Sequence, residues 1–243
     1  TGVPKGVPLT HANILAGVTS LHEAWKWQPT DILLHTLPLH HVHGLFVAQL
    51  GALNAGATTV WHRRFDADAV LQTLPMCTVY MGVPTHYHRL LQLDALDDAN
   101  LSRMRLFTSG SAPLPAHEHR EFARRTGHEI VERYGMTEVG IVLSNPLDGP
   151  RRPGRVGHPL PGVRARIVVP GSEEHVNDDV VGMLHIKGPS VFGGYHERPD
   201  ATAAVLLPGG WMRTGDLASR ASDGSIRIVG RQDDLILTGG YNV

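Results

Sequence analysis

Apolar residues follow two different spacings along the chain, and the change between them divides the chain in two. From Thr10 to about Gly140, apolar stretches with helical spacing alternate with short runs rich in branched residues. That alternation is typical of strands crossed by helices. The clearest elements are expected to be strands at 31–37, 104–108 and 129–132, and an amphipathic helix between Pro115 and Thr126 that Gly127 ends. This half is predicted to be layered α/β.

The second half begins after a loop rich in Pro, Gly and Arg at Asn145–Pro153. Short alternating strands follow, and the clearest are expected at 163–169, 183–187 and 225–229. Asp223-Gly224 is typical of a hairpin turn. We therefore expect an α/β part over residues 1–145 and a β-rich, barrel-like subdomain over 146–243.

An uncharged stretch, Gly44–Trp61, is the one candidate for a membrane span. Polar Gln49 and Asn54 interrupt it, and glycines punctuate it, so it is predicted to be a buried helix followed by a buried strand. The N-terminus has no basic segment leading into an apolar core, and no secretion signal is expected.

Composition indicates a soluble globular protein, because 42% of the 243 residues are apolar and only 19% are charged. The 22 basic and 23 acidic side chains are mixed along the chain, so we expect a small-molecule partner, with no nucleic acid and no membrane. Cys77 is the single cysteine and lies in an apolar run, which predicts a buried core thiol. A cytoplasmic location fits.

Two loops combine small residues with groups that can hold phosphate or a nucleotide. Thr1–Gly6 places glycines around Lys5, a point charge for phosphate, although a solvent-exposed lysine in a turn is an equal alternative. Ser109-Gly110-Ser111-Ala112-Pro113 follows a predicted strand and precedes a helix, the place where α/β proteins bind nucleotides. A tight turn that only needs small residues is again an equal alternative.

A third loop, Tyr134-Gly135-Met136-Thr137-Glu138, joins four compatible functions in five residues. An aromatic face can stack on a base, the glycine lets a ligand approach, Thr137 offers a hydroxyl to phosphate, and Glu138 is a hard oxygen ligand for Mg²⁺. In the β-rich half, Asp216 on a glycine turn can accept both ribose hydroxyls, and Arg231 can reach the same sugar.

These motifs occur in one order: TG-PKG, LPLHHVHG, SGSAPL, YGMTE, RTGD and GRQDD. In that order and spacing the chain resembles, over its whole length, the adenylate-forming superfamily of acyl-CoA synthetases, peptide-synthetase adenylation domains and luciferases. The resemblance implies the large N-terminal domain of such an enzyme, truncated here, with an α/β part that binds acid and ATP. It also implies two half-reactions: carboxylate and ATP form an acyl adenylate, and the CoA thiol then displaces AMP.

The resemblance also implies a role for each motif residue. Catalytic residues would be Thr137, Glu138 and His41, with Glu138 holding Mg²⁺; ATP would contact Lys5, Ser109, Gly110, Ser111, Ala112, Tyr134, Gly135, Met136, Asp216 and Arg231. Of these, Ser111 and Ala112 would lie against the adenine. Asp234 would be the hinge of a C-terminal lid, and Gly239 and Gly240 would border the pantetheine tunnel.

This chain departs from the family pattern at the hinge, where Asp233 stands in place of a frequent lysine. The family's catalytic lysine belongs to a lid that would begin after Val243, and the first half of the phosphate loop precedes Thr1. We therefore expect the chain, taken alone, to be a poor catalyst.

Arg133, directly before Tyr134, points to the acid. Many fatty or aromatic acid ligases of this family resemble the chain but carry a small residue there. A guanidinium in a partly dry pocket needs an anion, so a dicarboxylic acid could bind with its second carboxylate at Arg133. The chain looks most like malonyl-CoA synthetases, which implies malonate or methylmalonate. His43 is a second candidate substrate contact, with a core or gating histidine an equal alternative.

Other interpretations remain open at this stage. Arg133 could instead pair with Glu132 or Glu138. The acid could be a short, medium-chain or aryl monocarboxylate, or the chain could bind nucleotide without activity. The histidines at 40, 41 and 43 could form a zinc module, but no carboxylate or thiolate stands nearby at ligand spacing, which favours a chance cluster.

Overall fold

A seven-stranded sheet organises the first half of the molecule in the computed structural model, which describes residues 4–232, 237–238 and 241–242. The strand order is β2-β1-β3-β4-β5-β6-β7; β1 to β5 run parallel, while β6 and β7 pair antiparallel. The strands are β1 (Ile32–His35), β2 (Thr58–Trp61), β3 (Val79–Gly82), β4 (Leu106–Ser109), β5 (Ile130–Met136), β6 (Gly140–Ser144) and β7 (His158–Pro159).

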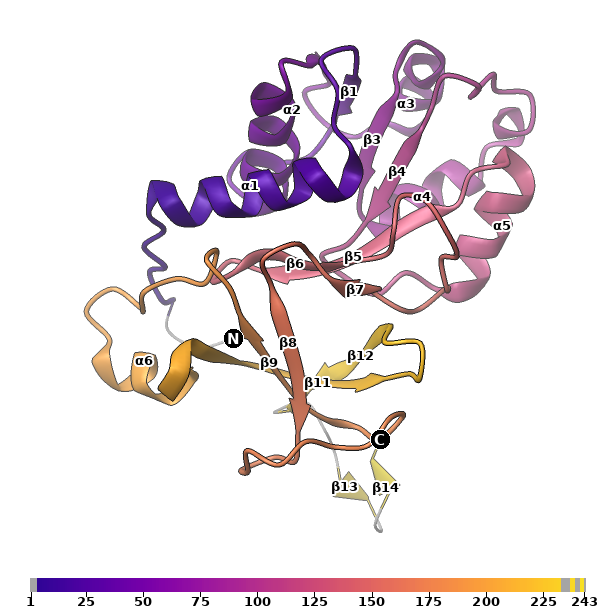
Figure 1. Cartoon of the computed structure of the whole chain (residues 1–243). Helices are drawn as coiled ribbons and strands as arrows, with labels where there is room; N and C mark the ends of the chain where they lie inside the picture. The colour runs from indigo at the N-terminus through magenta and orange to yellow at the C-terminus, as the bar shows by residue number, and fades with distance from the viewer. Residues whose placement is uncertain (1–3, 233–236, 239–240, 243) are drawn as a thin grey trace.

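Helices cover both faces of the parallel part, with α1 and α2 on one face and α3, α4 and α5 on the other (Figure 1). Side chains that alternate along a strand reach opposite cores: Leu33 packs with α1 and α2, and Leu34 packs with α3 to α5. The helical segments are α1 (His11–Trp25), the π-helix η1 (His43–Gln49), α2 (Leu50–Ala55), α3 (Ala67–Thr73), η2 (Leu74–Met76), α4 (Pro84–Leu91), η3 (Asp94–Leu96) and α5 (Ala116–Thr126).

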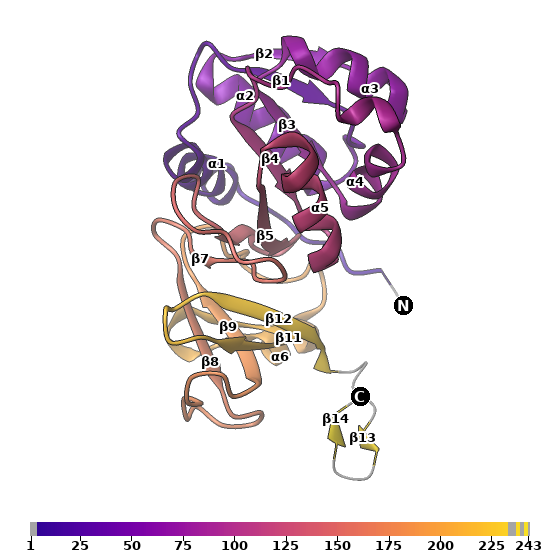
Figure 2. The ribbon, with the colours of Figure 1, turned by 90° about the vertical axis from the view of Figure 1, so that its right-hand side faces the viewer.

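An antiparallel sheet forms the second half and curls beneath the first, as the view in Figure 2 shows. Its order is β10-β11-β9-β8, with β12 also paired to β11, and a core cluster joins it to β6. The elements of this half are β8 (Arg164–Val168), β9 (Gly182–Lys187), α6 (Pro199–Val205), β10 (Leu206–Leu207), η4 (Pro208–Gly210), β11 (Trp211–Arg220) and β12 (Ile226–Arg231). β13 (Leu237–Thr238) and β14 (Tyr241–Asn242) pair with each other in a separate two-stranded sheet. The fold is thus α/β, a layered part followed by a β-rich, barrel-like part.

Most of the predicted elements are present within a few residues of their expected bounds. Gly127 ends α5 in the left-handed conformation, with a φ of +74°. Cys77 is fully buried as a free thiol, and burial raises its pKa to about 11. Within the described residues, the helices are too short or too polar to cross a membrane.

The prediction for Gly44–Trp61 is partly wrong. The segment is helical and then extended, but its helix begins with a π-helical stretch, and its strand β2 is not buried. β2 is the edge strand of the sheet, so its side chains meet neighbours on one edge only, and Trp61 remains 49% exposed.

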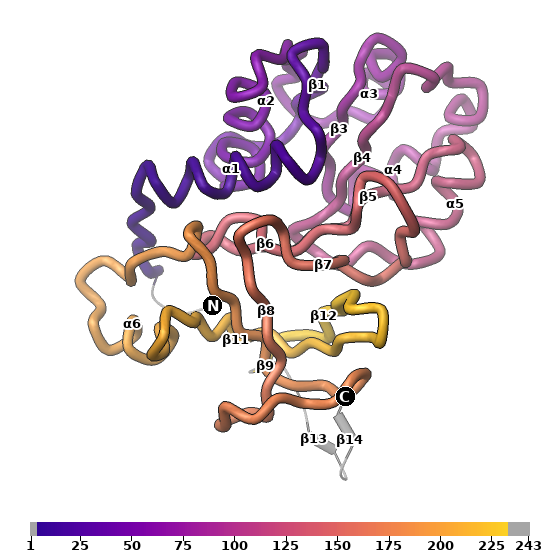
Figure 3. Tube along the Cα trace, viewed as in Figure 1, coloured from indigo at the N-terminus to yellow at the C-terminus, as the bar shows by residue number. Residues whose placement is uncertain are grey.

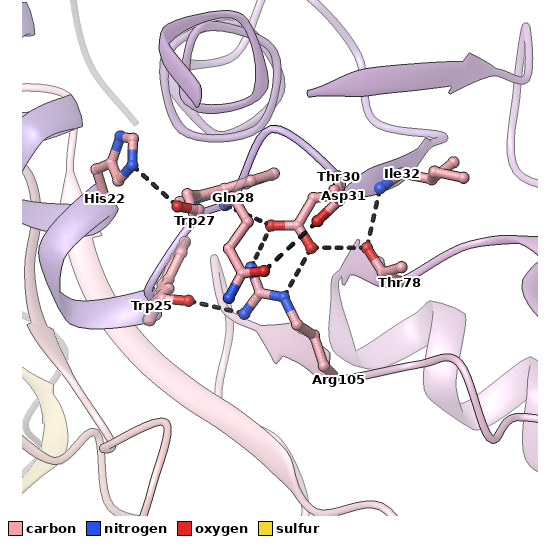
Figure 4. Close-up of polar contacts among 9 residues, drawn as sticks. All are labelled: His22, Trp25, Trp27, Gln28, Thr30, Asp31, Ile32, Thr78 and Arg105. Carbon is pink, nitrogen blue, oxygen red and sulfur yellow. Dashed lines mark hydrogen bonds and ion pairs between the residues drawn. The ribbon is translucent and has the colours of Figure 1, made fainter. Parts of the chain in front are cut away.

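A polar network holds the amino ends of the parallel strands (Figure 4). Asp31, which is 2% exposed, accepts two hydrogen bonds from Arg105, of which the Nε–Oδ1 bond is 2.7 Å long. The hydroxyl of Thr78 donates to the same carboxylate at 2.8 Å, and Arg105 Nη1 donates to the Trp25 carbonyl at 2.8 Å. The network thereby joins the end of α1 to the starts of β1, β3 and β4.

Candidate active site

A cleft of about 860 Å³ lies between the carboxyl ends of the parallel strands and the antiparallel sheet. Open α/β sheets bind ligands at this edge, because the loops that follow parallel strands meet there. Each of β1, β3, β4 and β5 contributes the segment that follows it or its own last residues, and β11 and β12 close the other side.

Most residues singled out from the sequence line this cleft. They are Lys5, His41, His43, Ser111, Arg133, Gly135, Met136, Thr137, Glu138 and Arg231. Ser109, Gly110, Ala112, Tyr134 and Asp216 do not line it; all but Ser109 adjoin a residue that does, and Ser109 lies two residues before Ser111. Asp234, Gly239 and Gly240 lie outside the described residues. The structure therefore brings together motifs that are more than 200 residues apart in sequence.

Local backbone features orient the SGSAP turn after β4 and the YGMTE loop at the end of β5. Ser111 has a φ of +70°, a left-handed conformation that costs energy in a residue with a side chain and is common at functional sites. A β-bulge between Tyr134 and Gly135, where β5 pairs with β6, changes the direction of the strand just before Thr137 and Glu138. The bulge thus lies within the paired part of β5 and β6 that lines the cleft.

Arg133 is a buried cation in the wall of the cleft and is only 4% exposed. Its Nε and Nη2 atoms are buried without a hydrogen-bond partner, and no carboxylate of a described residue forms an ion pair with it. Glu132 instead contacts His119 at 3.1 Å and accepts from the backbone of Gly154 at 2.8 Å. Burial lowers the pKa of Arg133 to about 10, so it stays charged near neutral pH.

Gly110 makes room for that guanidinium. A Cβ atom on Gly110 would lie 2.4 Å from Cζ of Arg133, far inside contact distance. The glycine of the SGSAP turn and the arginine before the YGMTE loop are therefore sterically matched across β4 and β5. Sequence reasoning missed this match, because two separate motifs hold the residues.

His43 lies beside Arg133 at the start of η1 and is 7% exposed. Its Nδ1 is 3.4 Å from the Ser111 hydroxyl, and its Nε2 is buried without a partner among the described residues. Burial, followed by the charge of Arg133, holds the pKa of His43 well below its usual value. The imidazole is therefore neutral near pH 7, and His41 is more exposed at the rim.

Asp216 and Arg231, the two candidate ribose contacts, face each other across β11 and β12. Arg231 Nε is 3.0 Å from Asp216 Oδ1, and the Tyr134 hydroxyl donates to the other carboxylate oxygen. Burial raises the pKa of Asp216, although the bonds to Tyr134 and Arg231 oppose the shift. These contacts tie the tyrosine of the YGMTE loop to the antiparallel sheet.

Lys5 and Glu138 both contact Tyr195, Lys5 over the ring and Glu138 at the hydroxyl, and the sequence analysis did not identify this tyrosine. The Tyr195 hydroxyl donates to Glu138 Oε1 at 2.8 Å, and Lys5 Nζ lies 4.5 Å from the centre of the ring. All three residues line the cleft. The tyrosine carries no motif signal of its own, since its partners are 57 or more residues away.

The oxygen and nitrogen donors that line the cleft fit Mg²⁺ better than zinc. The described residues contain no group of three His, Cys, Asp or Glu side chains that could hold a metal, so a zinc module has no support there. Mg²⁺ commonly binds through one or two carboxylates and completes its shell with substrate phosphates and water. Glu138, a carboxylate in the lining of the same cleft as Lys5, fits that pattern.

Comparison with known proteins gives the family. The family model of AMP-binding enzymes matches residues 1–196, most of the chain. The chain belongs to this family. A mitochondrial malonate–CoA ligase from Mus musculus is 41% identical, in an alignment that covers 100% of the chain and 48% of that protein. A sulfoacetate–CoA ligase from Cupriavidus necator is 40% identical, with the same two coverages.

Solved structures of AMP-binding enzymes agree with this assignment. ATP-bound MatB from Rhodopseudomonas palustris matches with a TM-score of 0.97 and 45% identity, covering 100% of the chain and 48% of that structure. A malonyl-CoA ligase complex with methylmalonyl-CoA and AMP matches with a TM-score of 0.88 and 42% identity, covering 100% of the chain and 53% of that structure. The chain therefore spans about half the length of these relatives, and the predicted family resemblance and fold class are confirmed.

Proposed function

We propose that the protein containing this chain is an ATP-dependent ligase that joins malonate or methylmalonate to CoA through an acyl adenylate. The observation that carries the proposal is the buried Arg133 guanidinium, which faces the cleft without a carboxylate partner among the described residues. A buried cation is costly unless an anion pairs with it. A substrate with a second anionic group would supply that partner.

The relatives support an acid of this kind. Malonate and sulfoacetate, named in two of the relatives, each carry a second anionic group beside the carboxylate that is activated. In the cleft, the planar guanidinium can bind that group through two parallel hydrogen bonds. Neutral His43, with its free Nε2, lies close enough to Arg133 to share the same end of the acid.

ATP would occupy the rest of the cleft. Lys5 and Thr137 would contact the phosphates, Ser111 and Ala112 the adenine, and Asp216 and Arg231 the ribose. Ser109, Gly110, Tyr134, Gly135 and Met136 would complete the nucleotide site. Glu138 would hold Mg²⁺, which neutralises phosphate charge when bound.

The reaction would proceed in two displacements. The free carboxylate of the acid attacks the α-phosphorus of ATP and releases pyrophosphate, with His41 at the rim of the cleft as a catalytic candidate. The CoA thiolate then attacks the acyl carbon and releases AMP. Asp234 as hinge and Gly239 and Gly240 beside the pantetheine arm belong to this proposal.

A cytoplasmic location is part of the same proposal, supported by the free thiol of Cys77, which suits a reducing compartment. The second candidate function is ligation of a monocarboxylic acid. A long-chain-fatty-acid–CoA ligase from Bacillus subtilis is 36% identical over the whole chain, which favours this alternative.

A pyrophosphate-release assay on the intact protein tests the proposal. Malonate, methylmalonate, butyrate and benzoate are compared at equal concentration with ATP, Mg²⁺ and CoA. We expect release with the two diacids at a kcat/KM about 100-fold above that for butyrate, the scale of one desolvated charge pair of roughly 3 kcal/mol. Higher kcat/KM for butyrate or benzoate would select the second candidate, and no release with any acid would indicate a nucleotide-binding protein.

A further inference from the structure

The segment 188–196 ties two separate parts of the nucleotide site together. The backbone N–H of Phe192 donates to the Glu138 carbonyl at 2.8 Å, and that of His196 donates to the Gly6 carbonyl at 2.9 Å. The Asn13 amide at the start of α1 also donates to the carbonyls of Pro189 and Val191, at 2.9 and 3.0 Å. In Figure 3 the indigo N-terminal chain descends from α1 towards the orange chain before α6.

Tyr195 is the side chain of this segment that enters the cleft, and it is only 8% exposed. Its ring packs edge-on against Phe192, with centroids 4.9 Å apart, and its backbone N–H donates to the Thr202 hydroxyl at 2.9 Å. The ring is therefore fixed by packing and the backbone by α6. A rigid phenol can hold the groups that contact it.

We propose that Tyr195 is a positioning residue for Mg·ATP, which orients the Glu138 carboxylate through its hydroxyl and the Lys5 ammonium over its ring. The proposal rests on the proposed function only in assigning Lys5 and Glu138 to the phosphates and the metal. Tyr195 itself touches neither substrate nor metal. It fixes one charge over its ring and the other at its hydroxyl.

The physical need for such a residue follows from the charges. Lys5 and Glu138 line the same cleft, and an ammonium and a carboxylate free to rotate there would pair with each other. No ion pair forms between them in the structure. Because the phenol holds one oxygen of Glu138, the other oxygen is available to a metal ion. Hydrogen bonds from neighbouring residues to a metal ligand commonly fix the orientation of that ligand.

Binding of a fluorescent ATP analogue, titrated with Mg²⁺ in the absence of acid and CoA, tests the proposal. Tyr195→Phe keeps the ring and removes the hydroxyl. We expect the Mg²⁺ concentration for half-maximal binding to rise about 10-fold, the effect of losing an outer contact to a metal ligand. Binding without Mg²⁺ should stay within about twofold, because the ring still holds Lys5. Tyr87→Phe, which removes a buried hydroxyl that donates to the Thr108 carbonyl, serves as the matched control. It should change neither the Mg²⁺ midpoint nor the affinity without Mg²⁺.

Two further variants separate positioning from a general loss of structure. Tyr195→Leu also removes the ring, and should weaken Mg²⁺-free binding by about two- to fivefold, the scale of a cation–π contact. In a Glu138→Gln background, Tyr195→Phe should change the Mg²⁺ midpoint by less than about twofold, since residues that act through one contact are not additive.

An unchanged Mg²⁺ midpoint in Tyr195→Phe would overturn the proposal, and so would an equal shift in the Glu138→Gln background. Melting temperatures of all variants identify a folding defect, and Tyr195→Phe remains interpretable if Tyr195→Leu does not fold. Because no acid is present, this result is independent of which acid the protein activates. A failure of the Tyr195 test would leave the malonate proposal standing, and a failure of the malonate proposal would leave the Tyr195 proposal standing.

Discussion

At the scale of single residues, Arg133 is costly to the stability of the fold, and the proposed binding of a second anionic group accounts for that cost. Its guanidinium is almost fully buried, two of its nitrogens have no partner among the described residues, and burial lowers its pKa. A buried polar group without partners destabilises a fold, and a buried cation does so most strongly. Such a residue is explained by a ligand more readily than by folding.

Because the buried charge of Arg133 destabilises the ligand-free fold, removing it is predicted to raise the free energy of unfolding. Arg133→Met keeps the length of the side chain and removes the charge, so the ligand-free protein should gain about 1 to 4 kcal/mol, as other buried charges do when replaced by apolar groups. Urea unfolding without ligands measures this change. A loss of stability would show that Arg133 is a structural residue.

Gly110 is predicted to control where the guanidinium lies. In Gly110→Ala the new Cβ would stand 2.4 Å from Cζ of Arg133, and the buried side chain must move. Displacing the guanidinium from the diacid removes a charged hydrogen-bond contact of roughly 1.5 to 3 kcal/mol, which is about 10- to 150-fold in kcat/KM. Steady-state kinetics of the single variant and of Gly110→Ala in an Arg133→Gly background measure it. The alanine should have no further effect once the arginine is gone, and an equal effect in both backgrounds would contradict the steric match.

At the scale of elements, the parallel strands separate stability from function. Their amino ends carry the Asp31–Arg105 network, and their carboxyl ends carry the cleft. Burial alone would raise the pKa of Asp31, but hydrogen bonds from Arg105, Gln28 and Thr78 together lower it below 3.8. The ionised carboxylate is therefore the form that stabilises the fold.

The sign of the pH effect follows from this shift. When the pKa of a group is lower in the folded protein than in the unfolded chain, the group stabilises the fold fully at pH values above its unfolded-state pKa. This stabilisation is lost as the pH falls through the folded-state pKa. Asp31→Asn should cost about 2 to 3 kcal/mol at pH 7, the scale of charge-assisted bonds lost. The difference from wild type should shrink below pH 3.8. Urea unfolding from pH 7 to pH 3 tests it, and a pH-independent difference would contradict the role of the charge.

Element type was predictable where a local pattern decides it. Branched apolar runs predicted β1, β4, β8, β9 and β12, and Gly127 predicted the end of α5. The π-helical start of η1 and the exposed edge strand β2 were not predictable, because both depend on which segments pack beside them. Tyr195 and Gly110 belong to the same class, since only the folded chain brings their partners close.

At the scale of the whole molecule, the cleft exists only because the two sheets meet. The proposed acid-binding residues Arg133 and His43 lie at the parallel sheet, while the candidate ribose contacts Asp216 and Arg231 come from the antiparallel sheet. Tyr134 and Tyr195 bridge the two parts through their hydrogen bonds. Under the proposed function, the choice of acid would therefore be a property of the assembled cleft, measurable as a preference between substrates.

The most direct test of the account compares malonate and butyrate in Arg133→Gly of the intact protein. Removing one partner of a buried charge pair costs roughly 3 to 5 kcal/mol, so kcat/KM for malonate should fall by about two to three and a half orders of magnitude. Butyrate should be unaffected or improved, because it no longer leaves a cation unpaired. The predicted result is a reversal of preference. Equal losses for both acids, or an unchanged rate with malonate, would contradict the account.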